Sequence, residues 1–211
     1  MCEYLICPVS IGELIDKLTI LDIKLKYISD NRLYDVKKEH NLLYSQICDK
    51  IDEYKYYYNL MKKINEDIWH LMDKIREIDI ETDKENWIKH CKMTIDYNDI
   101  RFRIKNKINT VFNSSIKEQK GYTPTKYLIS CSNIIDLHKI LVIIKFNSIV
   151  FDKVEIKCTS YIYSILSVNI KNDNLIIFDI NDDYYENNNI DDIYNKLRDN
   201  ELFQFIEKLE S

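Results

Sequence analysis

Glycine and proline are almost absent from this chain, which contains two of each in 211 residues. Both residues interrupt regular backbone structure, so we expect them only where the backbone requires them. One of each lies in the segment PVSIGE at residues 8–13. Pro8 stops a helix from running through it, Ser10 can act as an N-cap, and Glu13 completes a capping box. Gly12 keeps the first turn free of a side chain, and the segment therefore predicts the start of a helix.

The composition indicates a globular protein. Apolar residues make up 45% of the chain, which is typical of folded domains. The net charge of −5 argues against a general nucleic-acid binder, which is usually basic. The longest apolar runs, residues 140–144 and 175–178, are far shorter than the roughly 20 residues of a membrane span.

The N-terminus lacks the basic and long apolar regions of a signal peptide. We therefore expect a cytoplasmic protein, in the host cytoplasm or the virion if its source is viral, with no nucleic-acid or membrane partner. The six cysteines form no CxxC pair, which argues against a zinc knuckle. We expect reduced and mostly buried thiols, and we assign no metal site and no cofactor.

The chain changes character at residues 121–124, where a glycine is followed by a proline. Before this point apolar residues recur at helical spacing, and after it short β-rich runs alternate with helical runs. We expect an α+β fold, with a helical bundle domain over residues 1–120 and a small Rossmann-like α/β domain over residues 121–211.

The first part predicts a four-helix bundle, and its first helix is apolar on two faces, which is typical of a central helix. Weak turn signals separate the second and third helices, which could be one bent helix. The predicted helices cover about residues 11–29, 32–50, 53–79 and 84–114.

The second part alternates strands and helices, an order that predicts a three-stranded parallel sheet with right-handed crossovers. An Asn/Asp-rich surface loop is expected at residues 181–189. The predicted strands are residues 127–131, 154–158 and 175–180, and the predicted helices are residues 133–146, 160–168, 190–198 and 201–209.

Polar residues lie beside the apolar seams of three predicted helices. An unpaired buried charge costs several kcal/mol, so we expect the acids in these seams to pair with bases of the third and fourth helices. The expected pairs join Asp16 or Asp73 with Arg76, Arg101 or Lys105. The candidate ligand pocket consists of Ser10, Gly12, Glu13, Asp16, Lys17, Asn65, Trp69, Asp73, Arg76, Asn98, Arg101, Lys105 and Asn109.

Two interpretations of this pocket stay open. In the first, its cations and the open helix N-terminus at residues 10–13 bind an anion such as a phosphate. In the second, the charges form a buried salt-bridge network that fixes the register of the helices. Mutual satisfaction of the charges would favour the second interpretation, and an open cleft would favour the first.

Several segments carry a resemblance to a known family. They are PVSIGELIDKLTILDIK at residues 8–24, the polar positions of residues 65–69 and 73–76, and those of residues 97–109. Over about residues 5–122 the chain resembles domain of unknown function 6165, a family from bacteria and giant viruses. No activity is established for that family, so the resemblance implies no catalytic residue. Its polar motif residues are those placed beside the seams.

The second part resembles the first βαβαβ units of heptosyltransferase-type GT-B glycosyltransferases, on residues 127–141, 154–158 and 175–180. In those enzymes a glycine-rich turn follows the first strand, whereas residues 132–135 contain no glycine. A second Rossmann domain is also missing from the sequence, so we do not expect a complete glycosyltransferase.

Three functional hypotheses follow. The first is a binding or accessory module in glycan or sugar-nucleotide metabolism, with a phosphorylated or sugar-nucleotide ligand in an anion-binding pocket. The second is a small Mg²⁺-dependent enzyme that acts on a phosphorylated substrate with Glu13, Asp16 and Asp73. The third is a purely structural module that forms homo-oligomers.

Overall fold

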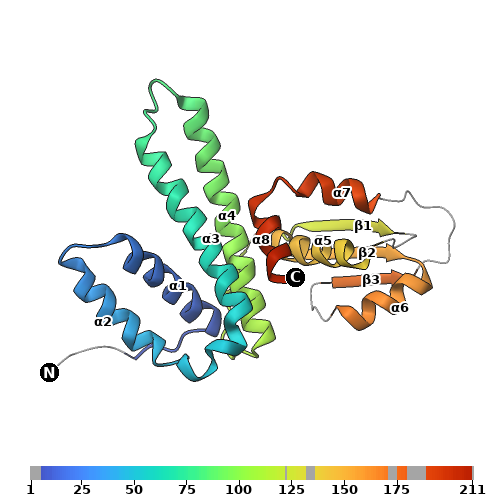
Figure 1. Ribbon diagram of the computed structural model, residues 1–211, viewed down its shortest axis with the longest axis horizontal. Helices are drawn as coiled ribbons and strands as arrows, with labels where there is room; N and C mark the ends of the chain where they lie inside the picture. The colour runs from blue at the N-terminus through green and yellow to red at the C-terminus, as the bar shows by residue number, and fades with distance from the viewer. Residues whose placement is uncertain (1–5, 122, 132–135, 171–174, 180–188, 211) are drawn as a thin grey trace. The chain divides into compact units, whose positions relative to one another are not determined.

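The computed structural model describes residues 6–121, 123–131, 136–170, 175–179 and 189–210 (Figure 1). The chain divides into two compact units, residues 1–120 and residues 121–211, which we call the helical unit and the α/β unit. The described residues are mostly helical, and the strands lie in the second unit. The α+β class predicted from the sequence is therefore confirmed.

The described residues of the helical unit form four α-helices and one short 3₁₀ turn. The 3₁₀ turn separates α2 from α3, so these are two helices and not one bent helix. The second helix ends earlier than predicted, because Ser45 turns its hydroxyl back to the carbonyl of Leu42 at 2.8 Å and the chain tightens there. The elements are α1 (Ile11–Tyr27), α2 (Arg32–Tyr44), η1 (Cys48–Lys50), α3 (Ile51–Glu77) and α4 (Lys84–Val111).

Helix α1 is central in this unit, as its two apolar faces predict. It contacts α2, α3 and α4, and its side chains Ile15, Leu18, Leu21 and Ile23 are buried. Figure 1 shows α3 and α4 as a long antiparallel pair. Helix α1 crosses the middle of α3, where it contacts residues 58–70, and it contacts the C-terminal half of α4. Polar groups on α1 therefore meet residues near 65 on α3 and near 105 on α4.

The α/β unit is built on a parallel sheet of order β1-β2-β3. In register, Cys131 lies opposite Cys158, and Val154 lies opposite Leu175. Asp136 caps α5 by accepting a hydrogen bond from the amide of Lys139 at 3.3 Å. The elements are β1 (Lys126–Cys131), α5 (Leu137–Val150), β2 (Lys153–Cys158), α6 (Ser160–Asn169), β3 (Leu175–Asp179), α7 (Ile190–Leu197) and α8 (Glu201–Glu210).

Some expectations fall outside the described residues, namely the first three residues of the helix expected at residues 133–146 and most of the loop at residues 181–189. Among the described cysteines, Cys131 and Cys158 are buried, but Cys7 is exposed and Cys48 and Cys91 are half-buried. The expectation of mostly buried thiols is thus wrong, because these three lie at positions that the core does not cover. No helix in the described part of the chain has the length and apolar character that a membrane span needs.

Candidate functional site

The N-terminus of α1 is closed by the protein itself. Ser10 is the N-cap, and its hydroxyl accepts a hydrogen bond from the amide of Glu13 at 3.1 Å, as predicted. The amide of Gly12 donates to the side-chain oxygen of Asn109 at 2.7 Å, and the amide of Ile11 donates to the hydroxyl of Ser114 at 3.3 Å. The prediction that these amides are open to an anion is therefore wrong, because α4 and the chain after it supply acceptors that local sequence patterns do not reveal.

The cap itself should be measurable. Replacing Ser10 by Ala removes the acceptor for the amide of Glu13 and should lower the free energy of unfolding by about 1 kcal/mol. Equilibrium urea unfolding would measure the difference. A Ser10→Gly variant should recover most of the loss, since glycine is a tolerated N-cap; a loss below about 0.3 kcal/mol for the Ala variant would contradict the capping role.

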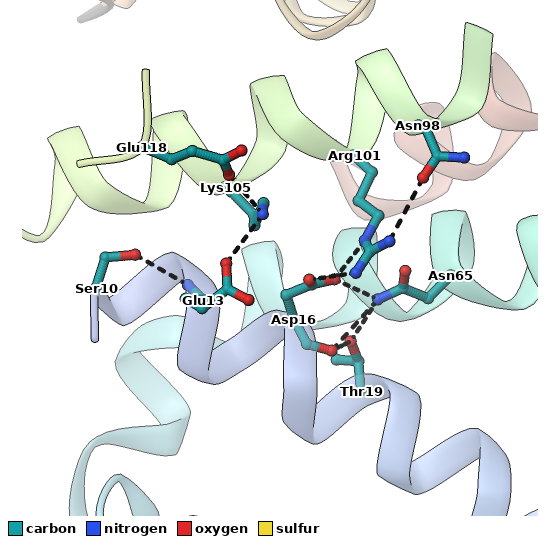
Figure 2. Close-up of polar contacts among 9 residues, drawn as sticks. All are labelled: Ser10, Glu13, Asp16, Thr19, Asn65, Asn98, Arg101, Lys105 and Glu118. Atoms are coloured by element: carbon teal, nitrogen blue, oxygen red, sulfur yellow. Dashed lines mark hydrogen bonds and ion pairs between the residues drawn. The ribbon is translucent and has the colours of Figure 1, made fainter. Parts of the chain in front are cut away.

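Asp16 and Arg101 form the centre of the polar cluster (Figure 2). The guanidinium of Arg101 binds the carboxylate in bidentate fashion, with Nε 2.7 Å from Oδ1 and Nη2 2.5 Å from Oδ2. Asp16 is 1% exposed, whereas the Arg101 side chain is 26% exposed. The hydrogen bonds that Arg101 donates to Asp16 raise the pKa of Arg101 above its already high value. A buried Asp16 paired with a cation of α3 or α4 was predicted, and this prediction is confirmed.

A buried amide completes the environment of Asp16. The side-chain nitrogen of Asn65 on α3 donates to Oδ1 of Asp16 at 2.9 Å and lies 2.9 Å from the hydroxyl of Thr19. That hydroxyl donates to the carbonyl of Asp16 at 2.9 Å. Side chains of three helices thus meet at one carboxylate, and both of its oxygens are hydrogen-bonded. This arrangement favours the interpretation in which Asp16 belongs to a network that fixes the register of the helices.

Lys105 lies one helical turn beyond Arg101 and has two acidic partners. Its ammonium is 3.0 Å from Oε2 of Glu13 and 2.6 Å from Oε2 of Glu118. The Lys105 side chain is 12% exposed, but the two carboxylates are 48% and 42% exposed. Burial lowers the pKa of Lys105, but the hydrogen bonds to Glu118 and Glu13 outweigh it, and the pKa is raised.

Glu118 is a residue of this cluster that the sequence analysis missed. It lies in residues 113–120, which follow α4 and which we call the return segment. Asn113 has a left-handed backbone, with φ of 52°, and the amide of Ser114 donates to the carbonyl of Asn109 at 2.8 Å. The chain thereby reverses and runs back along α4. The polar run Asn-Ser-Ser at residues 113–115 could have indicated a turn, but no periodic pattern singles out Glu118.

Four predicted site residues lie elsewhere. Lys17 pairs with Glu39 of α2 at 2.7 Å, and Trp69 stacks on Tyr27 with ring centroids 5.8 Å apart. Asp73 and Arg76 form an ion pair with each other at 3.0 Å and are 52% and 66% exposed. The prediction that these four residues share a pocket with Asp16 is wrong. The prediction that Asp73 lies with Glu13 and Asp16 in one acidic site is also wrong.

Asp73 and Arg76 lie too far along α3 to reach Asp16. At 1.5 Å per residue, position 73 lies about 12 Å beyond position 65, the α3 residue that contacts Asp16.

The remaining predicted residues do come together. Asn98 accepts a hydrogen bond from Nη1 of Arg101 at 3.4 Å, and the structure groups it with Ser10, Gly12, Glu13, Asp16, Asn65, Arg101, Lys105 and Asn109 in one region of the helical unit.

No three His, Cys, Asp or Glu side chains gather closely enough to hold a metal ion within the described residues.

The fold and the polar cluster define the class of this protein as a two-unit α+β protein whose helical unit is organised around a buried bidentate ion pair. The family model described as "Family of unknown function (DUF6165)" matches residues 6–135, more than half of the chain, and the chain belongs to this family. The match covers the site and extends through β1. No curated protein and no solved structure matches the chain.

Proposed function

We propose that this chain is a binding module that takes a small anionic ligand at the Arg101–Lys105 edge of the helical unit. The observation that carries the proposal is the position of Lys105. It is a nearly buried cation that holds two half-exposed carboxylates, one from α1 and one from the return segment. An ammonium in this setting can exchange one carboxylate for another anion without being left unpaired.

Arg101 supports the same ligand chemistry. Two of its nitrogens are committed to Asp16, while the contact of Nη1 among the described residues is a long one of 3.4 Å with Asn98. Arg and Lys four residues apart on a helix lie on one face, and together they offer the donors that phosphate oxygens accept. Because the α1 amides are already occupied, the proposed site is smaller than the predicted pocket and comprises Glu13, Asn98, Arg101, Lys105 and Glu118.

The ligand that we propose to test first is a sugar nucleotide, which carries phosphate groups. This choice rests on the resemblance of the second part of the chain to GT-B glycosyltransferases, and the cytoplasm, where sugar nucleotides are made, is the proposed location. The Mg²⁺-dependent enzyme hypothesis has weaker support, since Asp73 lies away from Glu13 and Asp16.

The test is a thermal-shift screen followed by calorimetry. Inorganic phosphate, nucleoside diphosphates and sugar nucleotides would be compared at constant ionic strength, with the wild type, Lys105→Met and Lys62→Met. Lys62 is a matched control, because its ammonium pairs with Asp22 at 2.9 Å on another part of the unit.

We expect phosphate-bearing compounds to raise the melting temperature of the wild type and of Lys62→Met, and to leave Lys105→Met unchanged. Equal shifts in all three proteins, or none in the wild type, would overturn the proposal. A shift that requires Mg²⁺ and survives Lys105→Met would instead support the metal-dependent enzyme.

A second candidate function is self-assembly through the helical unit. Ile88 and Ile95 are 51% and 64% exposed. They are seven residues apart on α4 and so share one helix face, which two copies of the chain could cover. Light scattering over a range of protein concentrations would test this: a dimer supports assembly, and a monomer at all concentrations excludes it.

A further inference from the structure

We infer that the return segment is a displaceable arm, and that Glu118 occupies the position of the ligand's anionic group until the ligand replaces it on Lys105. This inference rests on the proposed function and adds a regulation of the same site. A bound anion and the Glu118 carboxylate would compete for one ammonium, so the chain would carry its own competitor.

Glu118 is the exchangeable partner of Lys105. Glu13 lies in the first turn of α1, and its amide donates a hydrogen bond to the hydroxyl of Ser10 (Figure 2). The amide of Gly12 holds the same turn by donating to Asn109. Glu118 lies outside every helix and strand and is 42% exposed. Moving Glu13 would disturb α1, whereas moving Glu118 requires only a rearrangement of irregular chain.

The arm is firmly attached at its start. The hydroxyl of Ser114 accepts a hydrogen bond from the amide of Ile11 and donates to the carbonyl of Ile116 at 2.9 Å. With the left-handed Asn113, these contacts fix the reversal of the chain after α4. The arm can therefore move about this point without loss of the closed α1 N-terminus.

The far end of the arm makes long contacts with Asp99 and Thr110 of α4. Lys120 lies 3.6 Å from Asp99 and has its ammonium 4.5 Å from the centre of the Phe102 ring. The Lys120 and Asp99 side chains are about one-third exposed, at 30% and 35%, so solvent weakens their attraction. Lys117 adds only a long contact of 3.5 Å to the hydroxyl of Thr110. At 2.6 Å, the Glu118–Lys105 contact is shorter than these two contacts of Lys120 and Lys117 with α4.

Competition of this kind has a measurable consequence. A tethered carboxylate acts at a high effective concentration, and an anion binds only the fraction of molecules from which it has withdrawn. Glu118→Gln removes the competing charge and keeps the shape of the side chain. Phosphate should therefore bind the variant about tenfold more tightly than the wild type.

The experiment is calorimetric titration of inorganic phosphate, at constant ionic strength, into the wild type, Glu118→Gln, Glu39→Gln and Lys105→Met. Glu39 is the matched control, since it also pairs with a lysine, Lys17, at 2.7 Å. Its side chain is 41% exposed, nearly the same fraction as the 42% of Glu118. Hydrogen exchange of residues 113–120 would be followed with and without phosphate, because displacement should speed exchange there.

We expect tighter binding only in Glu118→Gln, wild-type affinity in Glu39→Gln, no binding in Lys105→Met, and faster exchange of the arm when phosphate binds the wild type. Equal phosphate affinity of the wild type and Glu118→Gln would overturn the inference that the arm is displaced and would leave the proposed binding site in place. Weaker binding by Glu118→Gln would also overturn it, by making Glu118 a ligand contact. No binding by any protein would mean that the proposed function itself fails.

Discussion

Replacing Arg101 by Met should lower the free energy of unfolding by about 3–5 kcal/mol. The variant would leave the carboxylate of Asp16, which is 1% exposed, without the cation that binds both of its oxygens. Asn65 alone cannot replace two charge-assisted hydrogen bonds. Urea unfolding followed by circular dichroism would measure the loss.

Two further variants sharpen this test. Arg76→Met breaks the ion pair with Asp73, which is more than half exposed, and should change stability by less than about 1 kcal/mol. The double variant Asp16→Leu with Arg101→Met removes both buried charges and should recover much of the loss. An Arg101→Met protein as stable as Arg76→Met would show that the buried pair does not hold the helices together.

Replacing Gly12 by Ala should cost about 2 kcal/mol. A Cβ atom at this position would lie 2.5 Å from the backbone carbonyl oxygen of Lys105 and 3.0 Å from the side-chain oxygen of Asn109. A backbone oxygen cannot turn aside as a flexible side chain can, so α1 and α4 would have to separate. The contact of the Gly12 amide with Asn109 would be lost or lengthened as they did so.

The other glycine of the chain provides the control for this prediction. A Cβ atom at Gly121 would meet nothing within 4 Å, and its backbone does not adopt a positive φ. Gly121→Ala should therefore change stability by less than about 0.5 kcal/mol. Equal stability of the two variants would contradict the close approach of α1 to α4.

The two interpretations of the polar cluster apply to different parts of it, one to the buried pair and the other to the Lys105 edge. Asp16 is satisfied by Arg101 and Asn65, as a network that fixes helix register would be. Lys105 holds half-exposed carboxylates and is the part of the cluster at which we propose exchange with a ligand. One cluster can therefore contain both a structural half and a binding half.

Local patterns in the sequence determined the helices of the first unit, the parallel strands of the second, the cap at Ser10 and the burial of Asp16. Each depends on residues a few positions apart, through helical periodicity, strand-like apolar runs and capping. Asp16 was predictable because a charge in an apolar stripe requires a partner nearby.

The tertiary structure alone decided which partners meet. Asp16 pairs with Arg101, 85 residues away, and not with Arg76, because Asp16 lies opposite Asn65 of α3 and position 76 is about 16 Å farther along that helix. The closure of the α1 amides by Asn109 and Ser114, and the return of Glu118 to Lys105, follow from the packing of α1 on α4 and from a chain reversal at Asn113. Such contacts depend on how whole helices cross, which no short-range spacing in the sequence specifies.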